Sequence, residues 1–216
     1  MKKENDRKRG TKLRMSVAFF SAAGFLAVLL FIYVGAAVRF DDVIRYFFYD
    51  FRNDILTPAA KAITYLGNWQ SIVIICIVLL AVKQLRMTYG VPVSAGALFI
   101  TIINKIIKEA VGRYRPDDIL HLTEAGGFSF PSGHSVTSMF VFGTLICLVR
   151  INVKSRASAN ILTVILAIPM ICIGLSRIYL GVHYPTDVIA GWLLGILVMM
   201  IVIEIYCIFY RKENHL

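Results

Sequence analysis

The sequence predicts an all-α, polytopic membrane protein with six transmembrane helices and an interfacial amphipathic helix between the first two. Of its 216 residues, 58% are hydrophobic, above the roughly 45–50% of ordinary soluble domains. The mean hydropathy is +0.72. Six apolar runs come near the length of about 20 residues that a helix needs to cross hydrocarbon, and they cover residues 15–38, 63–82, 91–107, 135–149, 159–176 and 186–209. We find no internal repeat and no low-complexity linker, so we expect one membrane domain over residues 1–216.

The first run follows a basic leader, residues 1–14, so a cleaved signal peptide is the alternative interpretation. Its apolar stretch of about 24 residues exceeds the roughly 7–15 of a signal peptide, which favours a retained helix and a cytoplasmic basic tail. The fourth run is short, so either its helix begins within the preceding loop or the bilayer is thin there. All four cysteines fall inside apolar runs, where they act as small hydrophobes rather than as a disulfide set or a metal cluster.

Residues 39–62 form the only long connection, and we expect them to lie at the outer surface. Aromatic and aliphatic residues recur there at spacings of three and four, which is typical of an amphipathic helix. They are Phe40, Ile44, Phe47, Phe48, Phe51 and Ile55. Two interpretations stay open: a hydrophobic lid packed on the bundle, or a helix in the headgroup plane beside which lipids enter. We expect Pro58 to end or kink this helix.

The charge pattern predicts the orientation. The chain has 23 Lys and Arg against 13 Asp and Glu, a net charge of +10. With both termini inside, most of the basic residues fall on inner segments, as the positive-inside rule requires. Attraction to anionic headgroups is then a secondary effect, and nucleic acid binding is not needed to explain the charge. Five basic residues near the outer ends need another reason, and a bound anion supplies one: Lys105, Lys108, Arg113, Arg115 and Arg177.

The stretch GFSFPSGHSVTSMF contains a candidate anion site. We expect Ser132, Gly133 and His134 to form the first turn of the fourth helix, where unpaired N–H groups and the positive end of the helix dipole favour an anion. Gly133 lets the backbone approach closely, and Ser132 adds a hydroxyl donor. Taken alone, this turn could equally be an ordinary helix cap.

Two further stretches strengthen the anion hypothesis. In KEAVGRYRPDD, Lys108 and Arg115 could reach over one site, although snorkelling to the interface is the alternative. In GLSRIYLGVHYPTD, His183 stands four residues before Asp187, a spacing that lets the carboxylate reach the imidazole. That contact fixes one tautomer and leaves the other ring nitrogen free as a base or nucleophile. A purely structural His–Asp pair is the alternative.

The three motifs together resemble those of the type 2 phosphatidic acid phosphatase family, integral-membrane lipid phosphatases related to vanadium-dependent haloperoxidases. KEAVGRYRP is similar to the pattern Lys, six residues, Arg-Pro, and PSGH to the second motif. SRIYLGVHYPTD is similar to Ser-Arg, five residues, His, three residues, Asp, so the matching region covers residues 108–187. The resemblance implies that His183 attacks phosphorus, Asp187 orients it and His134 protonates the leaving group. It implies a phosphate-binding set of Lys108, Arg115, Ser132, Gly133 and Arg177.

The resemblance also implies a bacterial cytoplasmic (inner) membrane enzyme with its active site on the extracytoplasmic side and with no metal or other cofactor. Its substrate would be a membrane lipid phosphate, such as undecaprenyl pyrophosphate, phosphatidylglycerol phosphate or phosphatidic acid. A phosphotransferase that passes the phosphoryl group to a lipid or sugar is the closest alternative, and a non-catalytic transporter or lipid-binding protein is the third. The roles of Lys105 and Glu204, the oligomeric state and the physiological substrate stay open.

Overall fold

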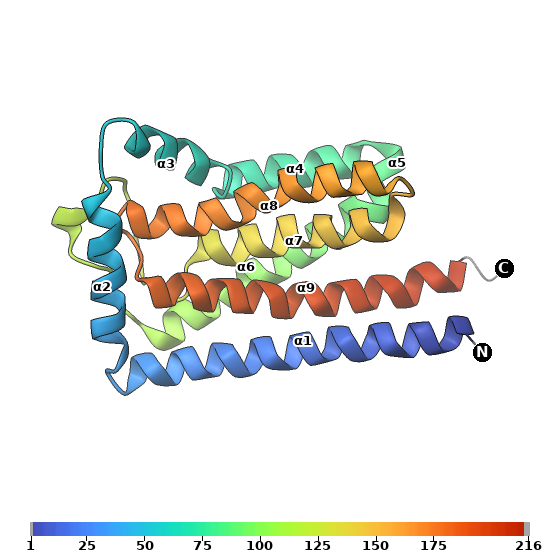
Figure 1. Cartoon of the computed structure of the whole chain (residues 1–216), viewed down its shortest axis with the longest axis horizontal. Helices are drawn as coiled ribbons and strands as arrows, with labels where there is room; N and C mark the ends of the chain where they lie inside the picture. Colours follow the sequence, from blue (N-terminus) through green and yellow to red (C-terminus); the bar gives the residue numbers. More distant parts are fainter. Residues whose placement is uncertain (1, 214–216) are drawn as a thin grey trace.

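The structure, a computed structural model, describes residues 2–213 as a bundle of long helices (Figure 1). Met1 and residues 214–216 of the expected single domain lie outside the described residues. The bundle is built mainly from α1 (Lys2–Tyr33), α4 (Trp69–Ala81), α6 (Val91–Val111), α7 (Gly133–Asn152), α8 (Arg156–Tyr179) and α9 (Pro185–Glu213). Helices α1 and α9 carry the two chain ends to the same end of the bundle, and α2 (Ala37–Asp50) crosses the opposite end (Figure 1).

The chain is an all-α, multi-pass membrane protein. Within residues 2–213, five helices are long and apolar enough to cross a membrane, or six if the bent pair α3 (Leu56–Tyr65) and α4 is one span. The pair bends by 47°, so the run 63–82 is not the single straight helix that we expected. At the break, a Cβ on Gly67 would lie 2.6 Å from Ile173 Cγ2. Glycine therefore allows the break to pack directly against α8.

The other predicted spans form helices whose ends differ from the apolar runs. Helix α6 continues to Val111 and follows a short helix, α5 (Lys83–Leu85), and a π-helical turn, Arg86–Gly90. Helix α7 has 20 residues because it begins at Gly133, inside the preceding loop. This start favours the first of the two explanations for the short fourth run.

Helix α7 is the centre of the bundle. Its residues Phe140, Val141 and Leu148 are fully buried in one core with Ile100 of α6 and Val198 of α9. Near its start, α7 packs closely on α9, because a Cβ on Gly191 would lie 2.9 Å from the Ser132 carbonyl oxygen. This contact brings the start of α7 beside the first turns of α9.

Helix α2 is shorter than the expected amphipathic helix, and the structure gives the direction of its faces, which the sequence left open. Asp41 is only 1% exposed and Arg45 is buried, whereas the apolar Val43, Phe47 and Phe51 are exposed. The charged face therefore packs on the protein, and the apolar face points outward. The single expected helix is in fact two, α2 and α3, separated by residues 51–55.

Asn53 explains why the chain breaks before α3. Its side-chain oxygen accepts hydrogen bonds from the backbone N–H groups of Ile55 (3.0 Å) and Leu56 (2.8 Å), as a capping residue does. Pro58 lies in the first turn of α3, a position that tolerates proline. The expectation that Pro58 ends the helix is therefore wrong.

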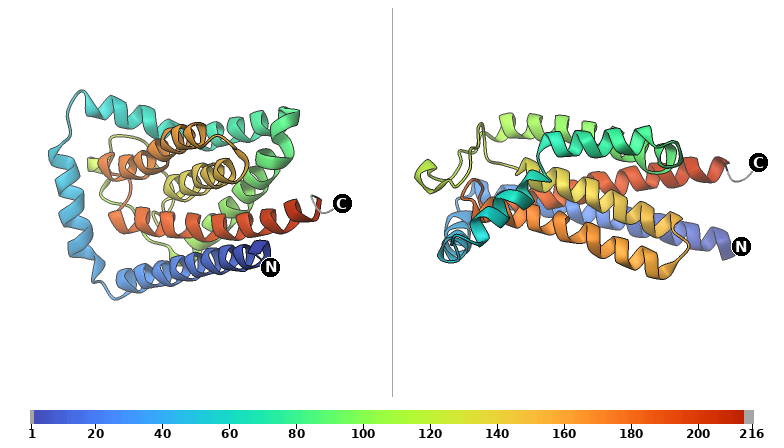
Figure 2. Two further views of the ribbon diagram at one scale, coloured as in Figure 1. Left: turned by 45° about the vertical axis from the view of Figure 1, so that its right-hand side comes forward. Right: turned by 90° about the horizontal axis from the view of Figure 1, so that it is seen from above.

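Helix α1 lies beside α9 in every view (Figure 2) and is joined to it by Glu204. The Glu204 carboxylate accepts from Arg14 Nε at 2.6 Å and from Thr11 Oγ1 at 3.0 Å. An acidic residue within a span is unfavourable unless it is paired, and this pair satisfies it. Glu204 therefore has a structural contact, which sequence reasoning left open.

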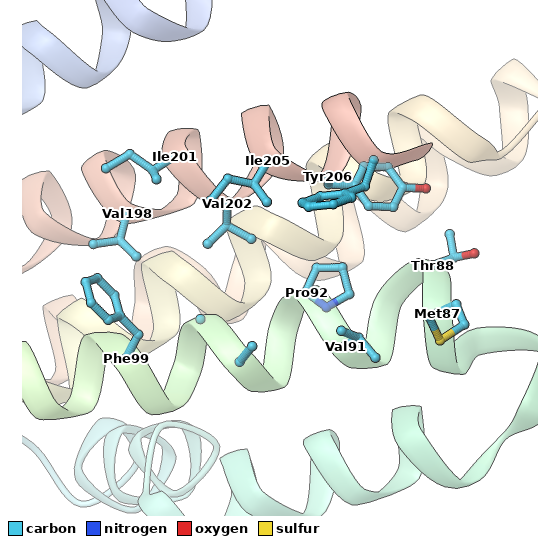
Figure 3. A pocket seen from close by; sticks show the side chains of 13 residues that line it. Met87, Thr88, Val91, Pro92, Phe99, Val198, Ile201, Val202, Ile205 and Tyr206 are labelled. Atoms are coloured by element: carbon cyan, nitrogen blue, oxygen red, sulfur yellow. The ribbon is translucent and has the colours of Figure 1, made fainter. Parts of the chain in front are cut away.

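A cavity of about 610 Å³ lies between α6 and α9 (Figure 3). Its walls are mostly apolar and include Phe99, Val198 and Val202. None of the expected site residues lines it. The chemistry predicted from the motifs is therefore found elsewhere, at the α2 end of the bundle.

Candidate active site

The expected site residues come from four segments that meet at the α2 end of the bundle (Figures 1 and 2). These segments are the end of α6 with the following loop, the start of α7, the end of α8, and the loop that leads into α9. The backbone N–H of Ser132 donates to the carbonyl of Asp187 at 3.0 Å, and Arg115 Nη1 lies 3.1 Å from His183 Nε2. The folded chain thus gathers the expected set: Lys108, Arg115, Ser132, Gly133, His134, Arg177, His183 and Asp187.

His183 and Asp187 form the buried pair that their spacing predicts. His183 Nδ1 lies 3.3 Å from Asp187 Oδ2, and the two residues are 2% and 0% exposed. Pro185 begins α9 and so places Asp187 in its first turn. The backbone N–H of Tyr184 also donates to Asp187 Oδ2 at 3.0 Å. The carboxylate is therefore fixed relative to the imidazole ring.

Arg115 identifies the tautomer of His183. A guanidinium only donates hydrogen bonds, so the contact of 3.1 Å with Arg115 requires Nε2 to be the acceptor. Nδ1 then carries the proton and donates to Asp187. Burial lowers the pKa of His183 well below its ordinary value of 6.5, and the positive charge of Arg115 lowers the pKa further. At neutral pH, His183 is an uncharged imidazole with a lone pair on Nε2.

Arg115 and Lys108 are held by backbone carbonyl groups. Arg115 donates to the carbonyls of residues 126, 127, 128 and 182 at 2.8–3.4 Å. Lys108 Nζ donates to the carbonyls of Phe128 (2.6 Å) and Ser129 (3.2 Å). Both cations therefore lie against the loop that leads into α7, and an arriving anion would exchange some of these contacts for its own oxygens.

Arg177 is the most deeply buried of these cations. It is 4% exposed, and its Nη1 donates to Thr64 Oγ1 at 2.9 Å. Its Nε has no hydrogen-bond partner among the described residues. Within residues 2–213, no carboxylate forms an ion pair with Lys108, Arg115 or Arg177. Buried charges normally have a counter-ion, so this set can accept an anion.

The start of α7 supplies neutral donors beside these cations. Ser132 precedes the helix as its N-cap residue, and its hydroxyl oxygen accepts from Ser135 Oγ at 2.9 Å. That contact leaves the Ser132 hydroxyl proton free to donate. The N–H groups of the first turn, beginning at Gly133, have no partner within the helix. This geometry agrees with the predicted anion cradle.

His134 lies in the first turn of α7 and contacts the break between α3 and α4. Its Nε2 is 2.7 Å from Asn68 Oδ1. His134 is also within electrostatic range of His183, Arg177 and Arg115. Sequence reasoning did not identify Asn68, although the pair Gly67-Asn68 is typical of turns and was the available signal.

Arg113 contacts the site, but sequence reasoning only included it among the five outer basic residues and gave it no role. Its Nη1 donates to Asp187 Oδ1 at 2.6 Å, and its Nη2 donates to Asp41 Oδ2 at 2.7 Å. Its guanidinium also lies over the Tyr184 ring, 4.1 Å from the centroid. The available signal was its position two residues before Arg115 in a non-helical segment, where alternate residues share a side. Lys105, by contrast, is exposed on α6.

In the described part of the chain, no three His, Cys, Asp or Glu side chains are grouped so as to hold a metal ion. The positive charge near His183 comes instead from Lys and Arg side chains. Located at the end of a membrane-spanning bundle, such a site defines a class: an integral-membrane protein with a histidine beside cations that can accept an anion.

Comparison with known proteins identifies the family. The sequence pattern of the PAP2 superfamily matches residues 89–211, more than half of the chain, and the chain belongs to this superfamily. It is 35% identical over 102 residues to phosphatidylglycerophosphatase B of Bacillus subtilis, covering 47% of this chain and 50% of that protein. It is 38% identical over 112 residues to decaprenylphosphoryl-5-phosphoribose phosphatase of Mycobacterium tuberculosis, covering 50% and 56%. The chain thus spans about half the length of these relatives.

A solved structure is similar over most of both chains. The crystal structure of a transmembrane PAP2-type phosphatidylglycerolphosphate phosphatase from Bacillus subtilis has a TM-score of 0.77 and 27% identity. The similarity covers 87% of this chain and 94% of that one. The helical arrangement is therefore shared well beyond the motif region.

Proposed function

We propose that this protein is a lipid phosphate phosphatase that removes a terminal phosphate through a phosphohistidine intermediate on His183. The observation that carries the proposal is the set of three cations, Lys108, Arg115 and Arg177, which lie near a neutral histidine and form no ion pair with a carboxylate among the described residues. Phosphoryl transfer depends mainly on positioning and on stabilising charge on the phosphate oxygens, and such a set provides both. The names of the similar proteins, which are phosphatases of lipid phosphates, support the same substrate class.

The proposed reaction has two steps. The Nε2 lone pair of His183 attacks phosphorus, and the bond between phosphorus and the leaving oxygen breaks, while His134, as the imidazolium that the negative phosphate favours, gives a proton to that oxygen and becomes neutral. Asp187 accepts the Nδ1 hydrogen bond throughout and stabilises the positive charge that the ring gains. Water then attacks the phosphohistidine, His134 takes a proton from it, and inorganic phosphate leaves.

The remaining site residues would hold the phosphate oxygens. Arg115 offers a planar fork that suits two oxygens at once, and Ser132 with the amide of Gly133 adds neutral donors. Lys108 and Arg177 complete the charge balance. In the free protein, Arg115 Nη1 donates a hydrogen bond to the lone pair of His183 Nε2. The substrate must therefore displace this hydrogen bond before Nε2 can attack. We propose that these side-chain and backbone donors stabilise the phosphate charge without a metal ion.

The membrane position suggests how a lipid reaches the site. Basic residues concentrate toward the end that holds both termini, so the positive-inside rule puts the candidate site on the extracytoplasmic side of a bacterial cytoplasmic membrane. The exposed apolar face of α2 would lie against lipid, so a headgroup could reach the histidines while its tail stays in the bilayer. Undecaprenyl pyrophosphate, phosphatidylglycerol phosphate and phosphatidic acid all present a suitable terminal phosphate.

The test is phosphate release by the purified protein in detergent with excess chelator. Each of the three lipids is offered to the native chain and to His183→Ala. We expect release that survives chelation and is absent in the variant, and the ranking of the lipids indicates the substrate. Metal-dependent release, or full activity of His183→Ala, contradicts the proposal. Transfer of phosphate to an added lipid or sugar alcohol with little free phosphate would instead indicate a phosphotransferase.

A further inference from the structure

Asp41 is a buried carboxylate on α2 whose contacts lead directly to the candidate nucleophile pair. Its Oδ1 accepts from the backbone N–H of Thr186 at 2.9 Å. Its Oδ2 accepts from Thr186 Oγ1 at 2.8 Å and from Arg113 Nη2 at 2.7 Å. Thr186 lies in the first turn of α9, where N–H groups lack partners within the helix. Asp41 therefore caps α9 from another helix and anchors Arg113 at the same time.

Arg113 extends this network to Asp187. Its Nη1 donates to Asp187 Oδ1 at 2.6 Å, while Asp187 Oδ2 faces His183 Nδ1 at 3.3 Å. The two carboxylate oxygens are thus divided between Arg113 and the imidazole. Since a carboxylate is planar, the guanidinium that holds one oxygen also fixes the direction of the other. The orientation of His183 consequently depends on Arg113.

We propose that Asp41 is a positioning residue for the phosphoryl-transfer step. It holds Arg113 and the start of α9 so that Asp187 keeps the Nε2 lone pair of His183 directed at phosphorus. This inference rests on the proposed role of His183. The inference also gives α2 a role in the site. The face of the helix opposite Asp41 exposes Val43 and Phe47, and Phe51 follows at its end. Helix α2 therefore connects an exposed apolar surface to His183 and Asp187.

The geometry separates positioning from phosphate binding. Asp41 is 1% exposed, and among the described residues its side chain accepts hydrogen bonds from Thr186 and Arg113 only. None of these hydrogen bonds, and no ion pair between described residues, joins Asp41 to the proposed phosphate ligands Lys108, Arg115 and Arg177. A change at Asp41 should therefore alter the rate of attack while substrate affinity is kept.

The experiment compares Asp41→Asn with Asp50→Asn, the same substitution at an exposed residue at the end of the same helix. For Asp41→Asn we expect kcat to fall about 10- to 100-fold, as is typical when a partner that orients a site ligand is lost. KM and the inhibition constant of inorganic phosphate should stay within about twofold, since the binding cations are intact. Asp50→Asn should match the native chain.

A second variant guards against a folding defect. Arg113→Lys keeps the charge but loses the fork that joins two carboxylates. It should lower kcat in the same way, and the double variant should lose less than the product of the two single losses, because both act through one path. Circular dichroism and thermal unfolding in detergent give the folded fraction used to normalise kcat.

Native kcat in folded Asp41→Asn, or a parallel loss of kcat and phosphate affinity, overturns the inference. So do independent, multiplicative losses in the double variant. The variant His183→Ala is measured in the same assay. It shows whether the inference about Asp41 alone is wrong or the proposed function is wrong as well. If His183→Ala is inactive and Asp41→Asn is fully active, the inference about Asp41 alone is wrong. If His183→Ala is active, the nucleophile assignment itself is wrong.

Discussion

His183 shows how two contacts can prepare one ring for attack. Arg115 requires Nε2 to be an acceptor, and Asp187 receives the proton on Nδ1. The nitrogen that would attack phosphorus is thus the one without a proton. Burial reinforces this state, because the charged imidazolium is disfavoured away from water.

The charge state of His183 gives a pH prediction. Because burial and Arg115 lower the pKa of His183, the ring stays neutral as the pH falls to 6.5 and is protonated only at lower pH. Imidazole 15N shifts of the purified protein in detergent, assigned with His183→Gln, should show a neutral ring with its proton on Nδ1 at pH 6.5. A titration midpoint at or above 6.5 would contradict the assignment.

The residues that sequence reasoning found and those it missed differ in a physical way. His183 and Asp187 are four positions apart, so a carboxylate in the first turn of a helix can reach an imidazole just before that helix. Asp41 and Arg113 are 72 positions apart, and their pairing depends on how α2 crosses the bundle. The spacing of residues within one segment therefore predicts local contacts such as the first. It cannot predict a contact between distant segments such as the second.

At the scale of elements, the break between α3 and α4 contributes to the site. It brings Asn68 to 2.7 Å from His134 Nε2, and Gly67 permits the close approach of the chain. The run 63–82 contains Gly67, Asn68, Gln70 and Ser71, but the apolar residues that follow raise its average hydropathy and conceal this break. A single hydropathy profile therefore predicts the span but not the break near its start.

Asn68 should orient His134 as the proton donor. We expect Asn68→Ala to lower kcat about 10-fold, less than the roughly 100- to 10,000-fold of general acid catalysis as a whole because His134 itself is kept, with a smaller effect on KM. The loss should shrink for a substrate with a better leaving group, such as a nitrophenyl phosphate, since less protonation is needed. Asn160→Ala, the same substitution at an exposed site on α8, is the control. Equal losses on both substrates would contradict this role.

Helix α2 illustrates the limit of an amphipathic pattern. The spacing of Phe40, Phe47 and Phe51 predicts one apolar face but does not say whether that face meets protein or lipid. In the structure it is exposed, and the charged face is buried by Arg113 and Thr186. In a membrane protein, the apolar face can point outward, because lipid is as apolar as the core.

The pairing of α1 with α9 gives a stability prediction. Glu204→Gln removes the charge that accepts from Arg14 and Thr11. Hydrogen bonds to charged groups contribute about 1.5–3 kcal/mol, so we expect a lower thermal midpoint in detergent with kcat nearly unchanged. Glu109→Gln, at an exposed position on α6, should leave the midpoint as it is. An unchanged midpoint for Glu204→Gln would show that the pair contributes little.

At the scale of the whole molecule, composition predicts more than any motif does. The apolar runs predict the all-α, multi-pass architecture, and the structure has five or six candidate spans among its described helices. The motifs near the ends of α6, α7, α8 and α9 then converge because these helices start or finish at the same end of the bundle. The membrane thus makes convergence of distant motifs predictable, since successive spans return to the same side.

The central claim is that phosphate passes through His183, and trapping the intermediate tests it most directly. The native chain, with excess chelator, is mixed with lipid labelled with 32P in its terminal phosphate and quenched in base within milliseconds. We predict a base-stable, acid-labile label that maps by mass spectrometry to His183, absent in His183→Ala and retained longer in His134→Ala. Phosphate release without any label on the chain, or a label on another residue, would contradict the account.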